Sequence, residues 1–327
     1  PMTGLFLSPK IFTEPERTPT RVGYGDGLVE LGKNNPSVVV LGADLSSSLC
    51  VDRFRDAYPD RFIQTGIAEQ DMMALAAGLA LSGKVPFVST YGVFCTGRAW
   101  DQLRTTVAYA KLNVKVGSGH GGVSVGADGA THQALEDIAI TRAIPNVTVI
   151  VPADYHETFK ATVAAASISG PVVIRFGREK VPEVTTHKTP FVPGRAEVYR
   201  DGGDVAIVAC GQMVYESLIA AAILSKEGLS ARVINCHTVK PIDAATLLSA
   251  ARGTGAVVTA EEHQVMGGLG SAVAEVLSQN YPVPIKMVGV QDTFGQSGEP
   301  DELMELYGLR AETIAEAALE AVKMKRG

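Results

Sequence analysis

The sequence predicts an α/β protein of two domains, each a mostly parallel sheet with helices on both faces. Three observations predict it. The chain has 327 residues, which is longer than a chain that folds around a single hydrophobic core usually is. Its 46% hydrophobic residues, 20% charged residues and 34 glycines are typical of a globular protein. Short apolar runs alternate with longer helical patterns, as in βαβ units whose strands are covered on both faces.

The first domain is expected over residues 1–185, after an N-terminal lead segment of about residues 1–20. Its strands are expected where apolar runs are short, and its helices where Ala, Leu and Met recur over longer stretches. The expected strands are residues 38–41, 61–63, 85–88, 114–116, 147–151 and 172–174, and the expected helices are residues 69–81, residues 100–110 and a segment after Asp154.

A linker and a second, smaller α/β domain are expected next. The segment from about Glu179 to Gly203 holds three prolines and several charges without a sustained period, which predicts a linker at residues 186–203. The second domain is then residues 204–327. Its expected strands are residues 205–210, 231–236, 256–260 and 285–290, and its closing helix is residues 311–325.

Charge, hydropathy and cysteine usage exclude several classes of function. A net charge of -6 does not suit a nucleic-acid backbone, whose binding requires many positive side chains. No run of about 18 apolar residues could span a membrane, and the first twenty residues lack the core of a signal peptide. The four cysteines form no CxxC pair and lie in apolar runs, as reduced thiols do. We expect a cytoplasmic protein that contacts neither nucleic acid nor membrane.

A carboxylate opens an apolar helix directly after a strand in the segment 66–72, Gly-Ile-Ala-Glu-Gln-Asp-Met. In any protein Glu69 would complement the dipole of the first helical turn. The carboxyl ends of parallel strands are also where open α/β sheets bind ligands, and apolar neighbours would raise the pKa of the carboxyl group. The residues alone leave both interpretations open.

A glycine-rich loop follows the strand expected at residues 114–116. It brings His120, Asp128 and His132 within thirteen residues of one another. Long loops are often functional, and imidazoles can donate to hydroxyl, carbonyl or phosphate oxygens, although a plain surface loop is the alternative. Tyr91 and Phe94 lie at the end of an earlier strand, where aromatic rings ordinarily pack in the hydrophobic core.

Together these segments closely resemble one family. Residues 66–72, 89–94, 120–133 and 237–243 resemble the carboxyl-terminal half of transketolase, and the stretch 127–133, Ala-Asp-Gly-Ala-Thr-His-Gln, is the most specific. The resemblance covers the chain from about Arg21. A one-chain transketolase is about twice as long and begins with the domain that binds the cofactor diphosphate and its metal. The chain therefore resembles the second subunit of a split transketolase, made of the pyrimidine-binding domain and the C-terminal domain.

The resemblance implies thiamine diphosphate as the cofactor. Glu69 corresponds to the glutamate that hydrogen-bonds a ring nitrogen of the aminopyrimidine, and Tyr91 and Phe94 correspond to aromatic positions around that ring. Asp44 is also expected to bind the cofactor. The third aromatic of the family pattern is Gly97 here, a departure that weakens the aromatic pocket.

The resemblance further implies transfer of a two-carbon ketol unit from a ketose phosphate to an aldose phosphate. His132 and His120 are the expected catalytic histidines along the sugar, and Asp128 would accept from a sugar hydroxyl.

The phosphate contacts of the family correspond to Arg21, Ser48 and Arg178. Two guanidinium groups and a hydroxyl suit a phosphate dianion. Arg175 lies three residues before Arg178 on the same expected strand and is the alternative to it.

A partner is implied as well. Gly25-Asp26-Gly27 is similar to the metal and diphosphate motif of thiamine diphosphate enzymes, but Asn34 follows Gly27 by only seven positions where a few tens are expected. No metal ligand is therefore assigned to this chain. Mg²⁺, or Ca²⁺ or Mn²⁺ in its place, would be held mainly by a separately encoded N-terminal subunit, in an α2β2 assembly.

Other functions stay open as alternatives. Within the thiamine class these are deoxyxylulose phosphate synthase and the second subunit of a 2-oxoacid dehydrogenase first component. A non-catalytic binding or regulatory module with the same fold comes from another class, as does an unrelated dinucleotide-binding oxidoreductase.

The segment 266–270, Met-Gly-Gly-Leu-Gly, lacks both the P-loop lysine and the spacing of a dinucleotide fingerprint, so we expect packing glycines there.

Overall fold

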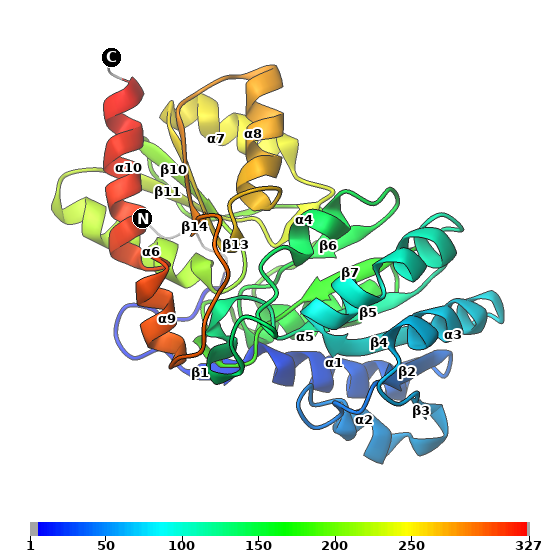
Figure 1. Ribbon diagram of the computed structural model, residues 1–327. Coiled ribbons are helices and arrows are strands. Elements are labelled where there is room, and N and C mark those ends of the chain that lie inside the picture. Colours follow the sequence, from blue (N-terminus) through cyan, green and yellow to red (C-terminus); the bar gives the residue numbers. More distant parts are fainter. Residues whose placement is uncertain (1–5, 326–327) are drawn as a thin grey trace.

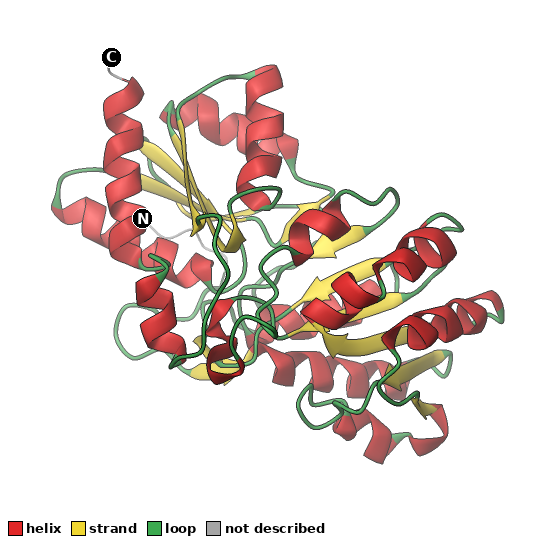
Figure 2. Cartoon of the chain, in the orientation of Figure 1, coloured by secondary structure: helices red, strands yellow, loops and turns green. Residues whose placement is uncertain are grey.

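A computed structural model describes residues 6–325. These residues form two α/β domains that pack against each other (Figure 1). Helices cover both faces of both sheets (Figure 2). The two-domain α/β prediction is confirmed. Among residues 6–325, no helix is both long and apolar enough to cross a membrane.

The N-terminal domain is built on a seven-stranded sheet in which β6 to β3 run parallel and β12, from the second domain, adds an antiparallel edge. In spatial order the strands are β12 (Thr238–Lys240), β6 (Thr148–Ile150), β7 (Val172–Arg175), β5 (Lys115–Gly119), β4 (Val85–Tyr91), β2 (Val38–Gly42) and β3 (Phe62–Gln64).

Alternation along β2 shows why this sheet is covered on both faces. Val39 and Leu41 belong to one core together with α3 (Glu69–Leu81), and Val38 and Val40 to another. That second core contains α1 (Thr20–Asn34) and α5 (Tyr155–Ala165). Successive side chains of a strand point to opposite faces, so an unbroken apolar run requires two layers of helices. The shorter helices are α2 (Asp52–Ala57) and α4 (Asp137–Arg142), and π-helical turns occupy Val93–Arg98 and Gln102–Ala108.

The C-terminal domain has a five-stranded sheet. Its strands pair in the order β14 (Ile285–Val290), β13 (Val257–Gln264), β10 (Val205–Ala209), β11 (Ala231–Asn235) and β9 (Glu197–Arg200). One face packs against α6 (Met213–Lys226) and α10 (Ala311–Lys325), and the other against α7 (Ala244–Thr254) and α8 (Leu269–Asn280) (Figure 1).

Two features at the boundary differ from the expected elements. β9 lies inside the range 186–203 that was expected to be a linker, and it pairs antiparallel with β11, so part of that range is sheet. β1 (Arg17–Pro19) falls inside the expected lead segment and pairs antiparallel with β8 (Lys180–Pro182). Neither strand has the long apolar run by which the buried strands are found. The first five residues of the lead segment lie outside the described residues.

Candidate active site

Glu69 is the first residue of α3 and is only 2% exposed. It follows the turn at Gly66, where φ is 73°. Its Oε2 accepts a hydrogen bond of 3.0 Å from Nη1 of Arg98, whose side chain is half exposed. The guanidinium of Arg98 also lies 4.4 Å from the ring centre of Phe94. The Arg98 guanidinium therefore contacts both the Glu69 carboxylate and the Phe94 ring.

Two aromatic and two imidazole rings meet beside the ends of β4 and β5. The rings of Tyr91 and Phe94 are nearly parallel, with centres 5.8 Å apart and planes at 19°. The imidazole of His120 stacks on Tyr91 at 3.8 Å, and that of His132 meets Phe94 edge-on at 5.6 Å. β4 and β5 pair with Tyr91 opposite Gly119, so the fold places their carboxyl ends side by side.

His120 is buried and its backbone has a φ of 57°, in the left-handed region that few non-glycine residues adopt. Burial lowers the pKa of its imidazole to about 3, and the positive charges of Arg178 and Arg21 and the imidazole of His132 act in the same direction. Its Nδ1 is buried without a hydrogen-bond partner among the described residues. The ring is therefore neutral near pH 7 and has an unused polar atom.

The side chains expected to contact phosphate form one group at the domain boundary. Arg21, at the start of α1, donates to the carbonyl of Ser48 at 2.9 Å and to that of Arg178 at 3.0 Å. Nη1 of Arg178 lies 3.5 Å from the Asp128 carboxylate. Arg21 and Arg178 line a cavity of about 490 Å³ between the two domains.

Arg175, the alternative to Arg178, occupies a different environment. Its side chain is 7% exposed, and its Nε donates to the carboxylate of Asp137 at 2.8 Å. Its Nη2 donates to the carbonyls of Ala134 and Glu262, at 3.0 and 2.8 Å. These contacts use both sides of the Arg175 guanidinium. Arg178 donates to the carbonyl of Val125 at 2.9 Å, and its half-buried side chain borders the cavity of about 490 Å³. Arg178 is therefore the more accessible of the two arginines.

Asp44 is exposed, and Gly97 lies three residues after Phe94 in the same π-helical turn. Asp44 is exposed after β2, with a φ of 63°, and its backbone N–H donates to Oε1 of Gln64 at 3.0 Å. A Cβ built at Gly97 would meet nothing within 4 Å, so the space where the family has an aromatic is open.

The two glycine-rich segments, residues 25–27 and 266–270, both lie in closely packed surroundings. Gly25, Asp26 and Gly27 lie inside α1, where Asp26 pairs with Arg53 and accepts from the Tyr155 hydroxyl at 3.1 Å. A Cβ on either glycine would lie less than 3.0 Å from a neighbouring helix or turn.

The segment 266–270 leads into α8, where the buried carboxylate of Glu261 accepts from the N–H groups of Leu269 and Gly270. A Cβ on Gly268 would lie 2.1 Å from that carboxylate, so close packing requires this glycine. Within residues 6–325, no group of three or more His, Cys, Asp or Glu side chains is arranged to hold a metal ion.

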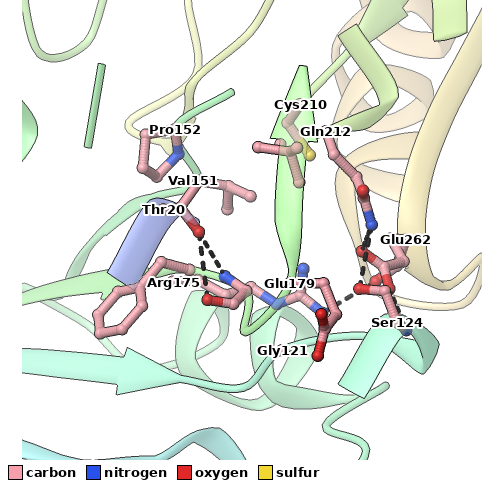
Figure 3. Close-up of a pocket in the computed structure, with 14 residues that line it drawn as sticks. Thr20, Gly121, Ser124, Val151, Pro152, Arg175, Glu179, Cys210, Gln212 and Glu262 are labelled. Carbon is pink, nitrogen blue, oxygen red and sulfur yellow. Dashed lines mark hydrogen bonds between the residues drawn. The ribbon is translucent and has the colours of Figure 1, made fainter. Parts of the chain in front are cut away.

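Sequence reasoning missed two charged side chains of the site. Arg98 follows Glu69 by 29 residues and has no pattern that links it to that carboxylate. Glu262 comes from the second domain and accepts from the backbone N–H of Ser124, 138 residues earlier. It helps to line a small cavity of about 30 Å³ between the domains (Figure 3). Only the folded chain brings these groups together.

Comparisons with known proteins identify the family to which the chain belongs. The model of the transketolase pyrimidine-binding domain matches residues 16–184, and that of the transketolase C-terminal domain matches residues 194–314. A Methanocaldococcus jannaschii chain provisionally named a transketolase C-terminal section is 44% identical over 306 residues, which cover 93% of this chain and 96% of that one. A 6-deoxy-6-sulfo-D-fructose transketolase subunit of a Clostridium species is 43% identical over 302 residues, which cover 92% and 94%.

Among solved structures, a split-gene transketolase described as an inactive β4 tetramer superimposes with a TM-score of 0.89 and 51% identity, covering 94% of this chain and 99% of that one. These relatives match nearly end to end. The chain therefore belongs to the transketolase family of thiamine diphosphate-dependent transferases, and it consists of that family's pyrimidine-binding and C-terminal domains.

Proposed function

We propose that this chain is the second subunit of a two-chain transketolase, and that it binds the pyrimidine half of thiamine diphosphate and the sugar phosphates. The observation that carries the proposal is the buried Glu69 carboxylate, which Arg98 links to the ring of Phe94 and so to the Tyr91–Phe94 pair. A carboxylate next to flat apolar surfaces suits a heteroaromatic ring that has both a nitrogen to hydrogen-bond and two faces to cover.

Glu69 would hold and exchange a proton with a pyrimidine nitrogen, and Arg98 would fix the orientation of its carboxylate. Tyr91 and Phe94 would orient the ring and exclude water. When bound, thiamine diphosphate supplies the nucleophilic carbon that takes up the two-carbon unit. Asp44 is exposed, so its proposed contact would be with the cofactor outside the ring cluster.

The histidines and the boundary charges would bind the sugar. His132 and the unpartnered Nδ1 of His120 can donate to or accept from sugar oxygens. Asp128 would accept from a hydroxyl. Arg21 and Arg178, with the Ser48 hydroxyl, would pair with the phosphate at the cavity between the domains, since guanidinium groups bind phosphate oxygens bidentately.

The proposal includes a separately encoded partner that holds the diphosphate and Mg²⁺. Asp26 is the acidic residue of the segment most similar to the metal motif. It lies inside α1, and its carboxylate is paired with the side chains of Arg53 and Tyr155. The split-gene relative forms an inactive tetramer of its β chain, which supports a chain that self-associates yet needs its partner. We propose an α2β2 assembly. A cytoplasmic location suits four cysteines that are all free thiols.

A donor and acceptor screen on the chain mixed with its partner tests this function. We expect two-carbon transfer from a ketose phosphate to an aldose phosphate that depends on thiamine diphosphate and Mg²⁺. Decarboxylation of 2-oxoacids without ketol transfer would assign the chain to another thiamine enzyme. No cofactor-dependent reaction with any donor would support a non-catalytic module.

A further inference from the structure

The carboxylate of Glu262 crosses from the C-terminal domain to the loop of residues 120–133, called the substrate loop below (Figure 3). Glu262 lies on β13 and is 7% exposed. Its Oε1 accepts from the backbone N–H of Ser124 at 2.8 Å, and its Oε2 accepts from Nε2 of Gln212 at 2.5 Å. Gln212 also donates to the Ser124 hydroxyl at 3.1 Å. A buried carboxylate with both oxygens committed is a strong, directional anchor.

The substrate loop has little conformational preference of its own. The short helix Val123–Asp128 is broken at Gly126, where φ is 85° and ψ is -121°. Gly122 and Gly129, on either side, have φ values of 92° and 74°. Glycine leaves the backbone many alternatives, so contacts from outside the loop must select this conformation. A Cβ on Gly122 would lie 2.1 Å from the Glu262 carboxylate, which shows how closely the two segments approach.

Other contacts hold the end of the loop to the same domain. Nε2 of Gln133 donates both to the carbonyl of Val123 and to that of Gln296 in the C-terminal domain, each at 3.0 Å. The backbone N–H of Gln264 donates to the carbonyl of Leu135 at 2.8 Å. Glu262 thus fixes the start of the short helix, while the neighbouring segments of the same domain fix the residues that follow His132.

We propose that Glu262 is a positioning residue, which acts through the Ser124 N–H to hold the substrate loop so that Asp128 and the two histidines face the sugar. The inference rests on the proposed function, because the role of Asp128 belongs to it. It gives the C-terminal domain a part in substrate selection although none of the proposed sugar contacts lies in that domain.

Amide hydrogen exchange on the chain alone tests the contact without any activity. In Glu262→Ala the Ser124 amide should exchange at least about tenfold faster, because its buried acceptor is gone. Glu261→Ala is the matched control, since Glu261 is the preceding residue and accepts from Leu269 and Gly270 instead. In that control the amides of Leu269 and Gly270 should speed up and that of Ser124 should not. Unchanged exchange of Ser124 in Glu262→Ala would overturn the proposal.

Kinetics of the reconstituted enzyme tests the consequence. Glu262→Ala should raise KM for a ketose phosphate about tenfold and KM for hydroxypyruvate less than twofold, because the short donor has fewer atoms for the loop to contact. Glu262→Gln keeps an oxygen for Ser124 and should restore most of the affinity. Should Glu262→Ala fail to fold, Gln212→Leu should move both readouts in the same direction by about threefold.

Equal losses with both donors would reduce Glu262 to a structural residue and overturn the proposal. A wild-type mixture that transfers no ketol unit would instead refute the proposed function, whereas the exchange of Ser124 would still decide whether Glu262 holds the loop.

Discussion

Two buried glutamates, Glu69 in the first domain and Glu261 in the second, each place a carboxylate at the N-terminal end of a helix, Glu69 from the first turn of α3 and Glu261 from β13 beside α8. Both oxygens of Glu261 are used within the chain, by the N–H groups of Leu269 at 2.7 Å and Gly270 at 2.8 Å. Among the described residues, Glu69 accepts from a single side chain, that of Arg98, whose guanidinium also lies over the ring of Phe94.

The difference shows that a buried carboxylate beside a helix N-terminus can be fully used within the chain, as Glu261 is, or can keep hydrogen-bonding capacity for a ligand, as we propose for Glu69. Glu261 caps α8, and Gly268 lets the backbone approach it. A carboxylate that is already saturated by backbone donors has little capacity left for a ligand. Availability, more than burial or helix position, separates a catalytic carboxylate from a structural one.

The largest expected effect is that of Glu69→Gln. Turnover of the reconstituted enzyme should fall by about a hundredfold or more, because an amide cannot exchange the proton that a carboxylate can. Glu261→Gln should leave kcat within about twofold when measured well below its unfolding temperature. Steady-state ketol transfer checks both. Similar losses in the two variants would remove the distinction between the two glutamates.

Arg175 and Arg178, which lie at the end of one strand, allow a similar comparison between a structural residue and a proposed phosphate contact. Arg178→Ala should raise KM for a sugar phosphate by about tenfold and change that for hydroxypyruvate little, because it removes a charge-assisted contact. Arg175→Ala should instead lower the free energy of unfolding by about 3–5 kcal/mol, since it leaves the buried carboxylate of Asp137 unpaired. Denaturant titration and donor kinetics on both variants check this. A KM effect that is specific to the sugar phosphate and occurs only in Arg175→Ala would make Arg175 the phosphate contact in place of Arg178.

Stability should respond to pH through Glu261. Burial raises the pKa of its carboxyl to about 7, so the folded chain binds a proton that the unfolded chain has released. Its contribution to stability is therefore full below about pH 4.5 and is lost as pH rises through about 7. Glu261→Gln should flatten this fall and cost about 1–3 kcal/mol for a lost buried hydrogen bond.

Glu157, whose pKa burial raises to about 8, should retain part of the slope in that variant. Chemical unfolding at pH 5 and pH 8 measures both slopes. An unchanged slope in Glu261→Gln would show that Glu261 does not titrate in this range.

The smallest effect concerns His120. Because burial lowers the pKa of its imidazole to about 3, its NMR signals should not move between pH 5 and pH 8. Its linkage has the opposite sign, since between pH 6.5 and 3 the unfolded chain binds the proton that the folded chain does not, so stability falls as pH falls through that window. Titration near pH 6.5 would mean that the ring is exposed to solvent.

Much of the fold could be predicted from the sequence, because buried parallel strands consist of unbroken apolar runs, as in residues 38–41 and 205–209. The antiparallel edge strands β1, β8 and β9 were not expected, since their short mixed segments depend on partners far along the chain. Glu69, Tyr91 and the two histidines come from contiguous motifs. Arg98 and Glu262 could not be found that way, because their roles exist only through contacts across 29 and 138 residues.

The most direct test of the account is calorimetry with thiamine diphosphate and Mg²⁺, first on this chain alone and then on its mixture with the subunit proposed to hold the diphosphate. Glu69 and the aromatic pair can bind the pyrimidine, but the charged diphosphate needs metal and backbone donors. We predict at most weak binding and no ketol transfer by the chain alone, and tight binding with activity in the mixture. Tight binding and full ketol transfer by the chain alone would contradict this prediction.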